Sequence, residues 1–159
     1  MSTVGYKEYD ILCVGSCVQD ILIEGMGPDS FAEPVTVLGS VLFTTGGDAA
    51  NEAIVLGRLG DRAGLVARID DGPVGEALYR NLTEEKIDLS YLCRDEASRS
   101  TTAFVILEED GGHKFFLHKG YEEGISLKEI DMDMLQKTRA VCIGSLYTSY
   151  RLDRGVLRC

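Results

Sequence analysis

Residues Thr44–Ala53 read TTGGDAANEA, and this stretch decides how the chain folds. Two glycines, Gly46 and Gly47, stand where a strand appears to give way to a helix, because small and apolar residues follow them at helical spacing. Asp48 has the side chain of an N-cap, and Gly60 is typical of the residue that ends a helix. The stretch therefore predicts a strand, a bare turn and a helix, in that order.

The same turn is a candidate binding site. Gly46 and Gly47 let a ligand approach the main chain, and the start of the helix offers unpaired N–H donors with a partial positive charge. Asn51, one turn inside a largely apolar helix, has an amide that both donates and accepts hydrogen bonds, which suits a ligand rich in hydroxyls. The alternative is purely structural: the glycines make a tight turn, and the alanines allow close packing of helix and sheet.

Apolar runs and helical patterns alternate along the chain. Residues 9–15, 64–69 and 140–144 are continuous apolar runs typical of strands buried on both faces. Pro73 suits the first turn of a helix, and apolar residues follow it at spacings of three and four. This order of elements predicts a doubly wound α/β fold with a parallel sheet.

Two segments depart from that order. Residues 35–43 and 101–119 read as strands, and the second segment is a hairpin closed by Asp110, Gly111 and Gly112. Within it, residues 102–107 are apolar on both alternating faces, so we expect one face to meet the domain or a ligand and the other a partner chain. The alternative is a central strand of the main sheet.

Asp20 follows the end of the first buried strand, at the edge of an α/β sheet where ligands collect. A carboxylate there can accept two charge-assisted hydrogen bonds from a polyol, although an Asp that only caps a turn is an equal alternative. The residues after Gly15 contain neither G-x-G-x-x-G nor the P-loop pattern, which argues against a dinucleotide-binding or P-loop protein.

The net charge of the chain argues against two classes of binding partner. Acidic residues outnumber basic ones by 26 to 16, and the net charge of −10 would repel both a nucleic-acid backbone and an anionic membrane surface. No apolar run approaches the roughly 20 residues of a membrane-spanning helix, and the first ten residues do not read as a targeting signal. We therefore expect a cytoplasmic protein with no nucleic-acid or membrane partner.

No metal site is expected. The five cysteines include no C-x-x-C pair, which favours reduced thiols over disulfides or a zinc site. His113 and His118 are five residues apart, a spacing that puts their side chains on opposite faces of a strand.

Three motifs occur in order along the chain: residues 15–20, the Gly-Gly-x-x-x-Asn pattern of residues 46–51, and residues 64–75. Together they resemble the N-terminal half of the ribokinase-like, or PfkB, carbohydrate kinases, over nearly the whole chain. Ala67 departs from the family pattern, which has a glycine at that point.

The resemblance implies a ribokinase-like fold, a doubly wound and mostly parallel α/β sheet that is incomplete here, with a small β-sheet lid. It predicts a single domain over residues 1–159, with lid strands inserted around residues 21–26, 35–43 and 101–119. Lid strands of this family often mediate dimerisation, so the resemblance also implies a homodimer.

The implied function is an ATP-dependent kinase that phosphorylates a hydroxymethyl group of a sugar or nucleoside. Carried over residue by residue, Asp20 and Asn51 would hold substrate hydroxyls, and the backbone of Gly46 and Gly47 would pack against the sugar. ATP and Mg²⁺ are implied for the complete enzyme. The identity of the sugar or nucleoside stays open.

The family's second signature, D-T-x-G-A-G-D, supplies its catalytic Asp and its anion hole, and it does not occur before Cys159. We therefore expect the C-terminal nucleotide-binding half to be absent, no catalytic, cofactor-binding or metal-binding residue in this chain, and no turnover by the chain alone. A non-catalytic sugar-binding or dimerisation module is the alternative.

Overall fold

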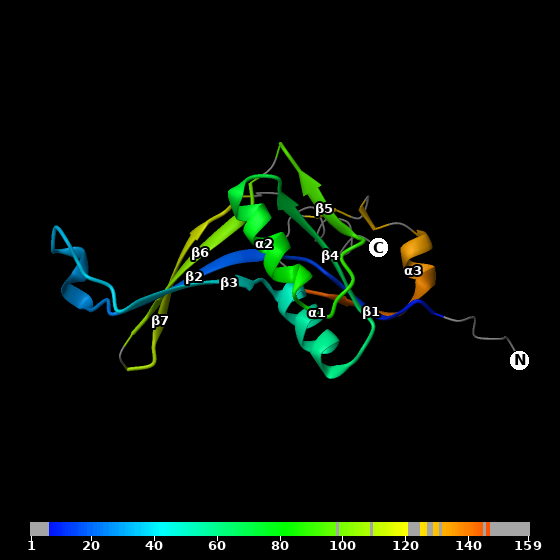
Figure 1. Ribbon diagram of the computed structural model, residues 1–159, viewed down its shortest axis with the longest axis horizontal. Coiled ribbons are helices and arrows are strands. Elements are labelled where there is room, and N and C mark those ends of the chain that lie inside the picture. The colour runs from blue at the N-terminus through cyan, green and yellow to red at the C-terminus, as the bar shows by residue number, and fades with distance from the viewer. Residues whose placement is uncertain are drawn as a thin grey trace, which may run out of the picture.

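The protein forms two four-stranded sheets, which we call sheet A and sheet B. Figure 1 shows sheet B reaching outward from one end of sheet A. The computed structural model describes residues 7–97, 99–108, 110–120, 125–126, 129–130, 132–144 and 146.

Sheet A is entirely parallel, and its three longer strands are the apolar runs seen in the sequence. Because both faces of a parallel sheet are covered by its crossover connections, such strands are apolar throughout rather than alternating. The expected α/β fold with a parallel sheet is confirmed. The strand order is β5 (Leu92–Asp95), β4 (Ala63–Asp70), β1 (Tyr9–Val14) and β8 (Thr138–Ile143).

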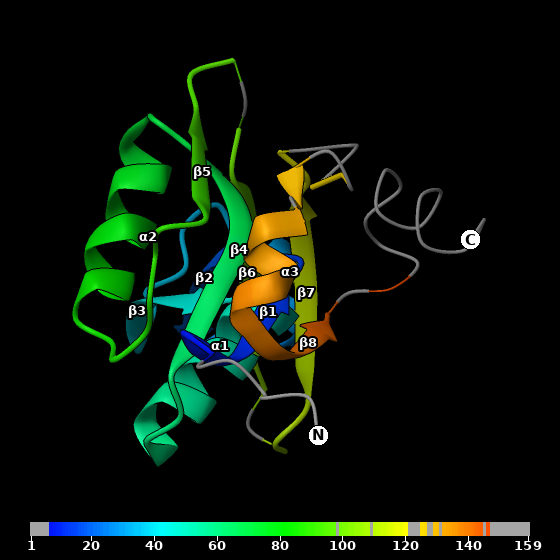
Figure 2. The ribbon, with the colours of Figure 1, turned by 90° about the vertical axis from the view of Figure 1, so that its right-hand side faces the viewer.

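Helices cover both faces of sheet A. Figure 2 shows α1 (Asp48–Leu59) and α2 (Pro73–Thr83) on one side of the sheet and α3 (Met132–Lys137) on the other. Leu65 packs with α1 and α2, whereas Leu12 packs with α3, and both side chains are fully buried. Burial of an apolar side chain of this size contributes about 1.5–3 kcal/mol, so the stable core lies on the two faces of sheet A.

Sheet B is mixed. Its strand order is β3 (Ser40–Gly46), β2 (Val18–Glu24), β6 (Thr101–Leu107) and β7 (His113–His118). β2 and β6 are parallel, whereas the two outer pairs are antiparallel. The β6–β7 hairpin turns at Gly111, which has a φ of +87°. The alternative, in which this segment forms a central strand of the main sheet, was wrong, because β6 is an inner strand of sheet B.

Two strand bounds differ from the sequence-based ranges. β3 begins at Ser40 rather than at residue 35, because its partner β2 ends at Glu24, opposite Ser40, and earlier residues have no strand to pair with. β2 itself starts at Val18, before the expected range 21–26. A short 3₁₀ helix, η1 (Pro28–Phe31), lies between the two strands and was not expected.

None of the helices that the structure describes is long and apolar enough to cross a membrane. The cysteines within the described residues, Cys13, Cys17, Cys93 and Cys142, are free thiols.

Candidate functional site

Asp20 lies where sheet B leaves the body of the protein, opposite Thr44 of β3 and Ala103 of β6. Its carboxylate occupies the space over Gly46, where any β-carbon would collide with it. The side chain is partly buried, and burial raises the pKa of Asp20 above its ordinary value. No residue that the structure describes donates a hydrogen bond to this carboxylate. A desolvated acid with a raised pKa and no internal donor is a typical feature of a binding site.

Contacts within the protein explain why the turn has glycines at positions 46 and 47. Gly46 makes room for the carboxylate of Asp20. Gly47 has a φ of +92°, which favours glycine, and a β-carbon there would lie 2.7 Å from the carbonyl oxygen of Ser16. Close packing against Asp20 and Ser16 therefore accounts for the missing side chains without a ligand.

The start of α1 differs from the expectation. Gly47 is the N-cap, and Asp48 is the first helical residue. The N–H of Asp48 donates to the hydroxyl of Ser16 at 3.0 Å, and the N–H of Ala50 donates to the carbonyl of Ser16 at 3.2 Å. The expectation of unpaired donors was wrong for these two groups, because Ser16 satisfies them. Sequence reasoning missed Ser16, for which the one available signal was a serine directly after the glycine that ends β1.

Asn51 lies in the first turn of α1, and its backbone N–H donates to the carbonyl of Gly47 at 2.9 Å. Its side chain is exposed, and no described residue forms a hydrogen bond with its amide. The structure therefore brings Asp20 and Gly46 into contact and places Asn51 one turn beyond Gly47. Gly46, Gly47 and Asn51 belong to the turn from β3 into α1, whereas Asp20 lies on the neighbouring strand β2. The carboxylate of Asp20 and the amide of Asn51 form no hydrogen bond with a described residue.

Neighbouring side chains hold Asp20 in place without competing for its carboxylate. Gln19 is buried, and its amide donates to the carbonyls of Thr44 at 2.8 Å and Asp20 at 3.1 Å, which ties β2 to β3. Burial raises the pKa of Cys17 to about 12, and the negative charge of Asp20 acts in the same direction. Cys17 is therefore a neutral packing residue rather than a nucleophile.

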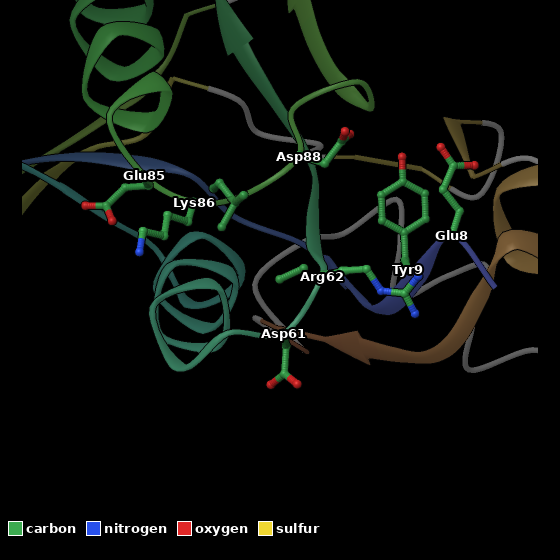
Figure 3. Close-up of a pocket in the computed structure, with 9 residues that line it drawn as sticks. Glu8, Tyr9, Asp61, Arg62, Glu85, Lys86 and Asp88 are labelled. Carbon is green, nitrogen blue, oxygen red and sulfur yellow. The ribbon is translucent and has the colours of Figure 1, made fainter. Parts of the chain in front are cut away.

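A separate cavity of about 420 Å³ opens at the amino ends of the strands of sheet A, away from Asp20. Figure 3 shows that the side chains of Asp61, Glu85 and Glu8 on its walls point in different directions rather than toward a common centre. Two of its charged groups are already paired internally, Arg62 with Asp10 and Glu85 with Arg58. We assign no ligand to this cavity.

Metal ligands are not clustered in the described part of the chain: no group of three or more His, Cys, Asp or Glu side chains there could hold an ion. The described residues at the turn therefore do not fit a metal ion.

The curated relatives of this chain include fructokinases and a ribokinase. The chain is 38% identical to a fructokinase of Escherichia coli over 77 residues, which cover 48% of this chain and 25% of that protein. It is 27% identical to a ribokinase of Bacillus subtilis over 139 residues, which cover 80% of this chain and 46% of that protein. The chain thus spans between a quarter and about half of the length of these two relatives.

A solved structure with the same fold is an uncharacterized sugar kinase from Pyrococcus horikoshii in complex with ATP. The TM-score is 0.69 at 24% identity, and the match covers 84% of this chain and 42% of that one. At this identity the likeness shows the fold, a parallel sheet A with a mixed sheet B. Residues 9–155 also match the family described as pfkB family carbohydrate kinase, and the chain belongs to that family.

Proposed function

We propose that this chain is the sugar-binding part of an ATP-dependent sugar kinase. The observation that carries the proposal is the carboxylate of Asp20, partly buried over Gly46 and without a hydrogen-bond donor among the described residues. Sugar hydroxyls are donors of the kind that this carboxylate lacks. Family membership and the names of the relatives, fructokinase and ribokinase, support a sugar as the ligand.

The chemistry of the turn suits the binding of a polyol. Asp20 accepts two hydrogen bonds from neighbouring hydroxyls, and Asn51 donates to one sugar oxygen while accepting from another hydroxyl. Gly46 and Gly47 carry no side chains of their own, so a sugar held by Asp20 can lie close to their main chain. These contacts bind and orient a sugar, and the hydroxymethyl group to be phosphorylated extends beyond them.

ATP and Mg²⁺ are part of the proposal for the complete enzyme only. ATP would supply the phosphoryl group, and the ATP-bound relative supports its use in the family. The described residues offer no metal-ligating cluster, and the sequence has no phosphate-binding loop that we recognise. We therefore propose that residues 1–159 form one substrate-binding domain with an inserted lid, that the nucleotide-binding half lies outside it, and that the chain alone does not turn over.

The test is titration calorimetry of the 159-residue chain with fructose, ribose and adenosine, beside the variant Asn51→Ala. We expect one of these ligands to bind and the variant to bind it about ten-fold more weakly, because a hydrogen bond is lost. Absence of binding by every ligand, or equal binding by the variant, contradicts the proposal. A phosphoryl-transfer assay on the longest product of the same gene tests the activity separately.

A second candidate, a dimerisation module, is supported by the exposed apolar side chains of sheet B. Phe43, Phe104 and Phe116 lie in one cross-strand row with exposed fractions of 63%, 39% and 47%. Apolar rows of this kind are typical of protein interfaces. We propose that two copies pair through sheet B, a role compatible with sugar binding. A cytoplasmic location stays a prediction.

A further inference from the structure

The β6–β7 hairpin enters and leaves sheet B at one point. Ser100 precedes the first residue of β6, and Gly120 lies two residues after the end of β7. A β-carbon on Gly120 would collide with the backbone of Arg99 and Ser100, and the N–H of Gly120 points to the hydroxyl of Thr101 at 3.4 Å. The two chain crossings therefore pack directly on each other, and we call Ser100 and Gly120 the neck of the hairpin.

Asp70, the last residue of β4 in sheet A, forms hydrogen bonds with this neck. Its carboxylate accepts hydrogen bonds from the backbone N–H of Ser100 at 2.6 Å, of Gly72 at 2.5 Å and of Gly75 at 3.3 Å. In return, the backbone N–H of Asp70 donates to the hydroxyl of Ser100 at 3.0 Å. Asp70 and Ser100 are 5% and 4% exposed, so water does not compete for these bonds.

The bonds of Asp70 join two parts of the protein. Gly72 is the N-cap of α2 and Gly75 lies in its first turn, whereas Ser100 leads into sheet B. From the neck, β6 runs beside β2 so that Ala103 lies opposite Asp20, and β7 puts Leu117 opposite Ala103. The row Asp20, Ala103 and Leu117 therefore depends on where the neck is held.

We propose that Asp70 is a positioning residue, which holds the neck against the start of α2 and thereby fixes Ala103 and Leu117 beside Asp20. Its neighbour Asp71 does not share this role, because Asp71 is paired with Arg94 at the surface. The two adjacent carboxylates thus provide a matched pair for a test. The effect on sugar affinity rests on the proposed function, whereas the effect on the hairpin does not.

The experiment compares amide hydrogen exchange, measured by NMR, in the wild-type chain and in Asp70→Asn, Asp71→Asn and Ser100→Ala. Asparagine keeps the size of Asp70 but turns an N–H donor toward one of its three N–H partners. We expect the amide of Ser100 and the β6 amides to exchange at least about ten-fold faster in Asp70→Asn, while Leu12 in β1 is unchanged. Asp71→Asn behaves as the wild type, and Ser100→Ala gives a smaller rise at the same amides.

Fructose and ribose titrations of the same four proteins give the second readout, in which we expect Asp70→Asn to raise the Kd about ten-fold. Unchanged exchange at Ser100 in Asp70→Asn overturns the inference, as does an equal acceleration at Leu12, which indicates a general loss of stability. Should Asp70→Asn fail to fold, Ser100→Ala decides: no local rise at β6 overturns the inference. If the wild-type chain binds no sugar, the proposed function fails, whereas the exchange result still decides the role of Asp70.

Discussion

Sheets A and B are each four strands wide, yet they bury their side chains very differently. In sheet A, Leu12 and Leu65 are fully buried between helices. On the outer strands β3 and β7 of sheet B, Leu42 and Phe115 are 56% and 57% exposed, whereas Val105 on the inner strand β6 is buried. The comparison teaches that sheet A contains most of the buried core, whereas the outer strands of sheet B leave large apolar side chains exposed. Each prediction below would break or sharpen this contrast.

The largest effect is expected in the core. Leu65→Ala removes a fully buried side chain and should lower the free energy of unfolding by about 2–5 kcal/mol, measured by urea denaturation. Leu42→Ala, the same change in sheet B, should cost less than about 1 kcal/mol, because little area is lost at an exposed site. Equal losses at the two positions would contradict the division between the sheets.

Asp20 should matter for binding and not for stability. Asp20→Asn removes a charged acceptor, and we expect sugar affinity to fall about 10- to 100-fold, measured by calorimetry. Because the folded protein raises the pKa of Asp20, its ionisation costs stability above the ordinary carboxyl range, so the Tm at pH 7 should be unchanged or higher.

The raised pKa of Asp20 also predicts a pH dependence of binding. As the pH falls, Asp20 becomes protonated and the affinity of the wild-type chain for sugar weakens, and this loss begins at a higher pH than it would for an Asp with an ordinary pKa. Asp29→Asn, an exposed carboxylate of η1, is the control and should bind sugar normally. A clear drop in Tm for Asp20→Asn would show that the carboxylate has a structural role instead.

Self-association should depend on sheet B alone. Phe43→Lys puts a charge into its exposed apolar row and should weaken dimerisation about ten-fold or more, measured by sedimentation velocity. Val55→Lys serves as the control, since Val55 is 55% exposed but lies on α1, outside sheet B. A wild-type chain that stays monomeric at high concentration would rule out the interface.

The smallest effect is expected at Asp70, which connects sheet A to the neck of the β6–β7 hairpin. Burial by itself raises the pKa of Asp70, but hydrogen bonds from Ser100, Gly72 and Gly75 outweigh it, so the net pKa is lowered. A lowered carboxyl pKa stabilises the fold above the ordinary value of about 3.9, and this contribution is lost as the pH falls below it. The Tm, measured in thermal melts between pH 5 and pH 3, should therefore fall less steeply with decreasing pH for Asp70→Asn than for Asp71→Asn.

Sequence reasoning worked best where structure is decided locally. The helix from Asp48 to Leu59 ends at Gly60, which has a φ of +104°, as a glycine after an apolar helical pattern predicts. β1 and β4 were likewise visible as apolar runs, because burial on both faces leaves no alternation. The apolar run in β8 was also recognised as a strand, but the expectation that it is buried on both faces was wrong, because residues 139–141 are exposed.

Contacts between distant parts of the chain could not be predicted in the same way. The start of β3 depends on where its partner β2 ends, and the capping of α1 depends on Ser16, which is far from the helix in sequence. Sequence alone also does not distinguish Asp70 from Asp71, although one is buried and the other is paired at the surface. The four site residues stay a prediction. Gly46, Gly47 and Asn51 were selected because their chemical types are unusual at the start of a helix, and Asp20 was selected because it follows a buried strand.

The neck of the β6–β7 hairpin has a consequence for how the protein tolerates change. The chain enters the hairpin at Ser100 and leaves it at Gly120, and these two residues pack on each other. The hairpin is therefore attached at one place, and its turn lies at the opposite end, far from the core. Extra residues inserted at the Gly111 turn would lengthen the hairpin without disturbing sheet A. Variation in loop length should therefore concentrate at this tip, where it changes the length of the hairpin while the fold stays intact.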